Sequence, residues 1–205
     1  MTQATQMLDD VTGIILAGGR SSRFGSDKLA IDIDGRTMLQ RAVDAVAVVA
    51  PRIVVVLAPD ADPPPPAALD HRLDIVHDKA PFLGPLAGLA AGLDAVRTSI
   101  ALVAAGDMPR MVPAVLQRLA STVGANRHAV NLEVPRRMQS LPMAISVDVA
   151  REAVTALLRG DERSLRALLR DLDASSIPAP VWLSLDPAGD TILDIDRPAD
   201  LHRRR

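Results

Sequence analysis

The 205-residue chain contains no cysteine. A disulfide framework and a thiolate metal site are therefore both excluded. Aromatic residues are almost absent as well, since the chain has one Trp, two Phe and no Tyr. A nucleobase bound by this protein would consequently be recognised through backbone and aliphatic contacts, because there is no aromatic shelf on which it would stack.

The chain also lacks any apolar run of the roughly 18 residues that a membrane-spanning helix requires. Its first twelve residues, MTQATQMLDDVT, contain acidic but no basic side chains and therefore do not resemble a secretion signal. The formal net charge of −2 argues against a general nucleic-acid-binding protein, which needs a broad basic surface. Together these absences favour a cytoplasmic protein that binds neither membranes nor nucleic acid.

The apolar segments in the first part of the chain alternate between two types. Short, β-branched runs predict buried strands, and longer segments with apolar residues at helical spacing predict helices. This alternation predicts an α/β fold with a mostly parallel sheet and right-handed crossovers. We expect strands at residues 13–17, 52–58, 73–78 and 100–104, a hairpin or edge strand at 29–35, and helices at 37–50, 85–96 and 112–122.

Beyond residue 122 the pattern is less regular. Two apolar segments around the basic turn PRRMQS predict a small β-ribbon, and two amphipathic segments after it predict helices. We expect ribbon strands at 128–134 and 141–147, helices at 149–160 and 163–172, short strands at 181–185 and 191–195, and a terminal helix at 197–205. Four consecutive prolines within residues 59–70 predict a stiff surface connection inside one domain.

The segment GIILAGGRSSRFGSDK, residues 13–28, joins a predicted strand to a glycine-rich loop. Ligands of α/β sheets bind at the carboxyl ends of strands, and glycines let backbone N–H groups approach an anion closely. Arg20, Arg23 and Lys28 add positive charge, a combination that suits a triphosphate; the alternative is a surface turn with solvated arginines. The loop matches neither G-x-x-x-x-G-K-[ST] nor G-x-G-x-x-G, which disfavours a P-loop and a dinucleotide-binding motif.

The loop sequence LAGGRSSRFGSDK resembles a family signature, L-A-G-G-x-S-x-R-M-G-x-D-K, with Phe24 in place of Met. This signature is that of the molybdenum cofactor guanylyltransferases, nucleotidyltransferases that attach GMP to molybdopterin. Five further segments resemble motifs of the same family in the same order: GPLAGLAAGL, AAGDMP (with Gly106 in place of Cys), MQSLPMAIS, GDERSLRALL and LDIDRPADL. The resemblance implies a single nucleotidyltransferase domain over residues 1–205, with residues 1–10 as a disordered leader. It also implies a three-layer Rossmann-like fold, with helices on both faces of the sheet and a small β-ribbon.

The resemblance implies a GTP site at the carboxyl ends of the strands. Asp107 follows a predicted strand, where a carboxylate suits a hard divalent ion that bridges phosphates. Asp78 resembles the acid that the family uses near guanine, whose N1–H and N2–H₂ groups donate to one carboxylate. The implied catalytic residues are Arg23, Lys28 and Asp107, and the implied GTP-binding residues are Leu16, Ala17, Gly18, Gly19, Arg20, Arg23, Lys28, Asp78, Gly84 and Asp107.

The implied metal ion is Mg²⁺, with Asp107, Asp194 and Asp196 as its candidate ligands. Asp194 and Asp196 lie two residues apart, so in an extended segment both side chains point to one side. An alternative for Asp196 is the N-cap of the helix predicted after it. The guanylyltransferases usually have Asn at these positions, and cytidylyltransferases of the same superfamily more often have D-x-D, so CTP is kept as an alternative nucleotide. The Gly-Gly and Asp-Lys pairs of the first loop favour GTP.

The implied acceptor is molybdopterin or its molybdenum-loaded form, whose terminal phosphate attacks the α-phosphorus of GTP and releases pyrophosphate. Candidate acceptor residues are Arg136, Arg137 and Gln139 in the predicted ribbon turn, together with Arg163 and Ser164; the alternative is a solvated basic turn. Client molybdoenzymes or their chaperones are further candidate partners. Three other functions stay open: a CTP-using molybdopterin cytidylyltransferase, another small-acceptor nucleotidyltransferase, and a non-catalytic nucleotide-binding or molybdoenzyme-chaperone paralogue.

Overall fold

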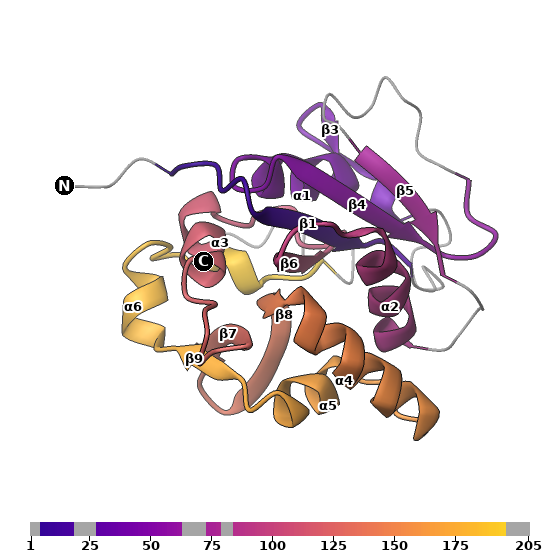
Figure 1. Cartoon of the computed structure of the whole chain (residues 1–205). Coiled ribbons are helices and arrows are strands. Elements are labelled where there is room, and N and C mark those ends of the chain that lie inside the picture. The colour runs from indigo at the N-terminus through magenta and orange to yellow at the C-terminus, as the bar shows by residue number, and fades with distance from the viewer. Residues whose placement is uncertain (1–4, 19–27, 63–72, 79–83, 196–205) are drawn as a thin grey trace.

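The computed structural model describes residues 5–18, 28–62, 73–78 and 84–195 of the chain (Figure 1). Within these ranges the central element is a seven-stranded sheet with the order β5-β4-β1-β6-β8-β7-β9. Strand β1 pairs in parallel with β4 and β6, and β4 pairs in parallel with β5. Strand β8 runs antiparallel to both of its neighbours, and β9 is parallel to β7. The strands are β1 (Val11–Leu16), β4 (Arg52–Leu57), β5 (Leu73–His77), β6 (Ile100–Ala105), β7 (Ala129–Val134), β8 (Arg137–Ser146) and β9 (Ser175–Ile177).

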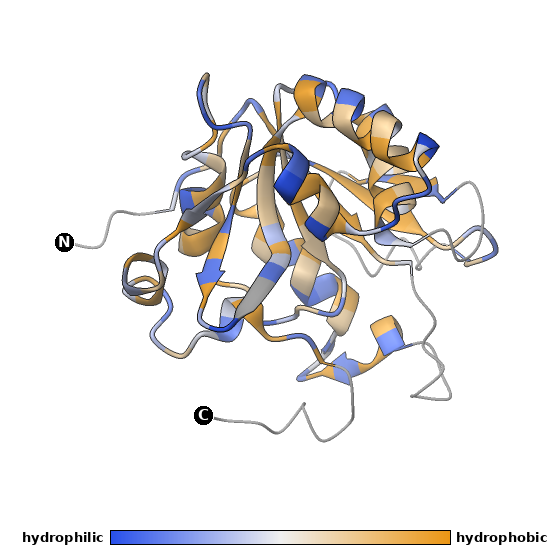
Figure 2. Cartoon of the chain, turned by 90° about the horizontal axis from the view of Figure 1, so that it is seen from below, coloured by the Kyte–Doolittle hydropathy of each residue, from blue (hydrophilic) through white to orange (hydrophobic). Residues whose placement is uncertain are grey.

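Helices pack on both faces of the sheet, which gives the three layers that the sequence predicts (Figure 1). One apolar cluster joins the sheet to α1 (Met38–Ala47), α3 (Pro113–Ala120) and α6 (Ala179–Leu183). The other joins it to α2 (Pro85–Ala95), α4 (Val147–Arg159) and α5 (Leu165–Asp171). Neighbouring strand residues alternate between the clusters, and Figure 2 shows largely apolar strands among helices that carry both polar and apolar residues. No helix in the described ranges is both long and apolar enough to cross a membrane.

The hairpin before α1 shows how local sequence sets the fold. Strands β2 (Asp32–Ile33) and β3 (Arg36–Thr37) pair antiparallel around Asp34 and Gly35. Both turn residues have positive φ, of 52° and 82°, as a two-residue type I′ turn requires. Thr37 then caps α1 by accepting a hydrogen bond from the Gln40 backbone N–H, and the Gln40 side chain accepts one from the Thr37 backbone N–H. This capping box confirms the helix start expected from the sequence.

Two predictions for the last part of the described chain are wrong. Residues 181–185 alternate in polarity like a strand but lie largely in α6, because only Trp182 faces the core, where its indole N–H donates to the backbone carbonyl of Glu133. Pro180 in the first helical turn fits this helix. Residues 191–195 are not a strand either, since a short 3₁₀ helix, Asp190–Ile192, begins this segment. The two strands predicted to form a ribbon are β7 and β8, and they belong to the main sheet. The separate two-stranded sheet consists of β2 and β3.

The segment before β1 is hydrogen-bonded to the domain. The Leu8 N–H donates to the Val49 carbonyl at 2.8 Å. The Asp10 carboxylate accepts hydrogen bonds from the side chain and the backbone of Ser99, and these bonds lower the Asp10 pKa below its usual value. The described structure therefore includes contacts from Leu8 onward, within the stretch that the sequence suggests as a leader.

Replacing Gly13 with alanine is expected to destabilise the domain. Gly13 lies in β1 directly beneath α1, and a Cβ there would overlap Cγ1 of Val46. Gly13 and Val46 are both buried, so α1 must shift away from the sheet to relieve the overlap. This shift costs about 1–3 kcal/mol in the free energy of unfolding. Urea unfolding measures the loss. Gly124→Ala is the matched control, since a Cβ at Gly124 meets no atom within 4 Å; equal midpoints for the two variants would contradict this account of the packing.

Candidate active site

Four parallel strands end at the same edge of the sheet. In sheet order these are β5, β4, β1 and β6, and the antiparallel β8 begins at this edge. Asp78 follows β5, Gly18 follows β1, and Asp107 follows β6. Backbone hydrogen bonds hold these positions in register, because the Asp78 N–H donates to Leu57 and the Gly106 N–H donates to Leu16. The sheet therefore brings the candidates from three separate parts of the sequence to one edge.

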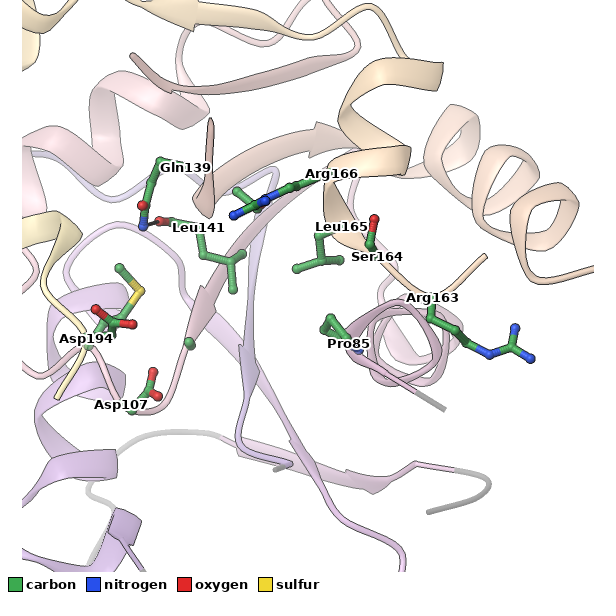
Figure 3. A pocket seen from close by; sticks show the side chains of 12 residues that line it. Pro85, Asp107, Gln139, Leu141, Arg163, Ser164, Leu165, Arg166 and Asp194 are labelled. Carbon is green, nitrogen blue, oxygen red and sulfur yellow. Dashed lines mark hydrogen bonds between the residues drawn. The ribbon is translucent and has the colours of Figure 1, made fainter. Parts of the chain in front are cut away.

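A pocket of about 630 Å³ opens at this edge, between the end of β6, the start of β8 and the first turns of α2 and α5 (Figure 3). Its walls come from five segments of the chain, three of which lie in the last third of the sequence. Its lining residues are Pro85, Ala105, Asp107, Met108, Gln139, Ser140, Leu141, Arg163, Ser164, Leu165, Arg166 and Asp194.

The strongest electrostatic contact at the edge joins the first loop to the end of β6. Lys28 begins a short 3₁₀ helix, and its Nζ donates to Oδ2 of Asp107 at 2.9 Å. The two side chains are only 11% and 28% exposed, so the contact is shielded from water more than a surface ion pair is. Two of the three predicted catalytic residues are thus in direct contact. The third, Arg23, lies outside the described residues, as do Gly19, Arg20 and Asp196.

Asp194 lies beside Asp107. The Ile195 N–H donates to the backbone carbonyl of Asp107 at 3.0 Å, and both carboxylates line the pocket on the same side (Figure 3). Two carboxylates at one site are donors of the kind that Mg²⁺ prefers. Within the described ranges, no group of three acidic or histidine side chains is placed to hold a metal ion.

Asp78 has an unused acceptor. Its Oδ1 is buried and has no hydrogen-bond partner among the residues that the structure describes. Its Oδ2 lies on the side of Gly88 in α2, where a Cβ would stand 3.8 Å away. A buried carboxylate oxygen without a donor is costly, so this position fits an oxygen that accepts a hydrogen bond from a ligand.

The start of β8 forms the wall opposite α2. Asn131, which is buried, donates from its side chain to the Gln139 carbonyl at 2.8 Å and accepts from the Ser176 hydroxyl at 2.7 Å. The Gln139 side chain in turn donates to the Leu141 carbonyl at 2.6 Å. This chain of hydrogen bonds fixes the backbone that lines the pocket. Arg136, in the β7–β8 turn with φ 65°, does not line the pocket, and the side chain of Arg137 lies outside the described part.

The segment before α5 contains two further candidate residues, Arg163 and Ser164. Arg163 donates to the Glu162 carbonyl and to the Asp161 carboxylate, and its guanidinium points away from Asp107 and Asp194 (Figure 3). Ser164 caps α5 by accepting from the Ala167 N–H. Both residues line the pocket, and both make hydrogen bonds that stabilise the segment at the start of α5.

Glu162 and Gly84 show why this segment packs tightly on α2. The Glu162 carboxylate accepts from the backbone N–H groups of Arg163 and Ser164, which lowers its pKa. Gly84 precedes α2 with φ 82°, and a Cβ there would lie 2.9 Å from the Arg163 carbonyl. Glycine is thus needed at Gly84 for both backbone conformation and close approach. Leu16 is the last residue of β1, and Ala17 and Gly18 follow it.

Sequence reasoning missed Arg166, Ser140 and Met108, which also line the pocket. Arg166 lies within the GDERSLRALL segment, two residues after the helix cap, but it carries no signal that distinguishes it from Arg170, the other arginine of α5. Its place in the pocket follows only from how α5 packs.

Comparisons with known proteins identify the family to which the chain is similar. Residues 13–176 match a family model described as "MobA-like NTP transferase domain". The chain is 34% identical over 198 residues to the "Probable molybdenum cofactor guanylyltransferase" of Chloroflexus aggregans, covering 93% of this chain and 91% of that protein. It is also 34% identical to the "Molybdenum cofactor guanylyltransferase" of Xanthomonas euvesicatoria, covering 81% and 82% of the two chains.

Solved structures show the same fold at lower sequence identity. The "Molybdopterin-guanine dinucleotide biosynthesis protein A" of Archaeoglobus fulgidus superposes with a TM-score of 0.73 at 20% identity, covering 93% of this chain and 94% of that one. The "2-C-methyl-D-erythritol 4-phosphate cytidylyltransferase" of Thermus thermophilus superposes with a TM-score of 0.69 at 18% identity, covering 95% and 96%. The arrangement of sheet and helices is therefore shared with other nucleotidyltransferases.

Proposed function

Because the chain belongs to the MobA-like NTP transferase family, we propose that it transfers GMP from GTP to the terminal phosphate of molybdopterin or its molybdenum-loaded form. The products are a molybdopterin guanine dinucleotide and pyrophosphate. The observation that carries this proposal is the similarity to molybdenum cofactor guanylyltransferases at 34% identity over 81% and 93% of the chain. Lys28, Asp107 and Asp78 support it, because they lie at one sheet edge.

The reaction needs positioning and charge neutralisation more than a proton-transfer residue. An ionised acceptor phosphate is already a nucleophile; its oxygen forms a bond to the α-phosphorus of GTP while the bond from that phosphorus to the bridging oxygen breaks. The charge that develops on the leaving pyrophosphate is stabilised by nearby cations and N–H groups. In this chain Lys28 and the amides after β1 would provide them, joined by Arg23.

Asp107 and Asp194 are the residues that would hold Mg²⁺, with Asp196 as a further candidate. When bound, the ion neutralises phosphate charge and polarises the α-phosphoryl group. The chain's own contribution is to hold the two carboxylates together, through the Ile195–Asp107 backbone hydrogen bond, at the end of the pocket next to Lys28.

The decisive experiment is pyrophosphate release from purified protein given molybdopterin, Mg²⁺ and each nucleoside triphosphate in turn. GTP-dependent release is expected. Preference for CTP would assign the protein to the cytidylyl class instead, and nucleotide binding without release would indicate a non-catalytic paralogue. We expect the enzyme to act in the cytoplasm, and its product would pass to molybdoenzymes or their chaperones.

Replacing Asp78 with asparagine is expected to weaken guanine recognition. A carboxylate accepts from both N1–H and N2–H₂ of guanine, whereas an asparagine amide presents one acceptor and one competing donor. The kcat/KM for GTP should fall about 10- to 100-fold. Steady-state kinetics with GTP and ITP measure the effect, because ITP lacks the 2-amino group and should lose less.

The matched control for this experiment is Asp74→Asn, an exposed acid in the same strand β5. It should keep the wild-type ratio of GTP to ITP turnover. An Asp78→Asn enzyme with the same ratio as the wild type would show that this carboxylate does not contact the base.

A further inference from the structure

The pocket of Figure 3 lies beside the row of GTP candidates rather than among them. In sheet order Asp78, Gly18 and Asp107 follow β5, β1 and β6, and the pocket extends from Asp107 onward to the start of β8. A nucleotide bound across the carboxyl ends of β5, β1 and β6 would bring its phosphates toward Asp107. The space beyond Asp107, in the direction of β8 and α5, is therefore available for the acceptor.

The charges on the pocket walls are unevenly distributed. Asp107 and Asp194 lie on the wall near β6. Lys28 neutralises part of this negative charge through its ion pair with Asp107, and further cations in the pocket would favour an anionic acceptor. Two arginines contribute to the wall formed by the start of α5. The Arg163 guanidinium is engaged by Glu162 and Asp161 and points away from the acidic wall (Figure 3).

Arg166 differs from Arg163 in its hydrogen-bond partners and in the direction of its side chain. Its side chain extends from α5 toward Gln139 and Leu141 at the start of β8 (Figure 3), and it is exposed to the pocket. It makes no hydrogen bond or ion pair with any residue that the structure describes. Among the residues that the structure describes, Arg166 is thus a cation without a hydrogen-bond or ion-pair partner, directed across the pocket toward the start of β8 (Figure 3).

We propose that Arg166 binds the phosphate monoester of the acceptor and holds it in line with the α-phosphorus of GTP, an assignment that rests on the proposed function. A guanidinium donates two parallel N–H bonds to a phosphate, which fixes the orientation of the phosphate as well as its position. The buried Asn131 bonds that fix the start of β8 keep the opposite wall in place for the rest of the acceptor.

This role predicts which kinetic constant changes. The attacking phosphate loses negative charge as its oxygen bonds to phosphorus, so the contact with Arg166 is no stronger in the transition state than in the bound complex. Interactions of that kind lower KM without raising kcat. Arg166→Ala should therefore raise the KM for molybdopterin about 10-fold or more, with the KM for GTP and the kcat at saturating acceptor within about 3-fold of wild type. Arg166→Lys should recover part of the loss, as a point charge without the fork geometry.

The experiment compares wild type, Arg166→Ala, Arg166→Lys and Arg170→Ala. Arg170 is an exposed arginine one turn further along α5, outside the pocket, and serves as the matched control. Each protein is assayed for GMP transfer and, separately, titrated calorimetrically with molybdopterin in the presence of Mg²⁺ and the absence of GTP. The titration measures acceptor binding even if no transfer occurs.

The assignment is supported if the dissociation constant for molybdopterin is higher in Arg166→Ala but not in Arg170→Ala, whether or not GMP is transferred. If wild type binds molybdopterin but transfers no GMP, the proposed function fails while this result stands. If Arg166→Ala and Arg170→Ala bind and turn over molybdopterin as well as wild type does, the assignment is overturned and the proposed function is unaffected. A loss of GTP binding in Arg166→Ala also overturns it, because it would place Arg166 at the nucleotide.

Discussion

Replacing Lys28 with alanine should lower kcat by about 100-fold or more, with the KM for GTP changed much less. The Lys28 ammonium lies 2.9 Å from Asp107 and is largely shielded from water, so it acts in a region where charge is weakly screened. Pyrophosphate gains negative charge as it leaves, and a cation fixed beside it favours the transition state over the bound substrate. Single-turnover measurements of GMP transfer, with GTP and acceptor saturating, give this rate directly.

Two variants separate charge from packing in this test. Lys28→Met keeps most of the aliphatic stem and removes the ammonium, whereas Lys28→Ala removes both. Both should lose the same activity if the charge is what matters, and the alanine variant should lose more thermal stability. A methionine variant with near-normal kcat would show that the ammonium serves only the ion pair with Asp107.

The parts of the fold that could be predicted from the sequence are those whose local pattern and tertiary environment agree. Strand β4 is apolar from Ile53 to Leu57 because both of its faces are covered by helices, and helix α1 carries its own capping box. Helix α6 was mispredicted because the alternation in residues 181–185 reflects one buried side chain, Trp182, and not a buried strand face. Trp182 is held by the hydrogen bond that its indole N–H donates to the backbone carbonyl of Glu133, about fifty residues earlier in the chain.

The same reasoning applies to the candidate site. The position of Asp107 could be predicted because a carboxylate just after a buried parallel strand lies at the carboxyl edge of the sheet. The distinction between Arg163 and Arg166 could not, because both lie at the start of α5 in a segment with several arginines. It depends on which acceptors each side chain meets: Glu162 and Asp161 accept hydrogen bonds from the Arg163 guanidinium, which points away from Asp107 and Asp194 (Figure 3). Contacts of this kind cannot be read from residue composition.

Replacing Asp107 with asparagine should lower kcat by about 100- to 1,000-fold, which is the scale observed when one preorganised electrostatic group is removed from a transition state. The substitution keeps shape and the Ile195–Asp107 backbone bond, so folding should be preserved. It removes a charge that faces both Lys28 and the proposed metal position. The apparent affinity for Mn²⁺, followed by the loss of its free electron paramagnetic resonance signal in the presence of GTP, should fall in parallel with activity. Asp148→Asn, an exposed acid on α4, is the control and should change neither quantity.

The contact between Lys28 and Asp107 makes a combined variant informative. If both residues act on the same phosphates, the effects of Lys28→Met and Asp107→Asn on kcat should not multiply, because the second substitution removes an interaction that the first has already disrupted. The double variant is therefore expected to be only slightly slower than the slower single variant. Fully multiplicative losses would mean that the two side chains stabilise separate parts of the transition state, and that the 2.9 Å pair breaks when substrate binds. Either result distinguishes a shared charge centre from two independent ones.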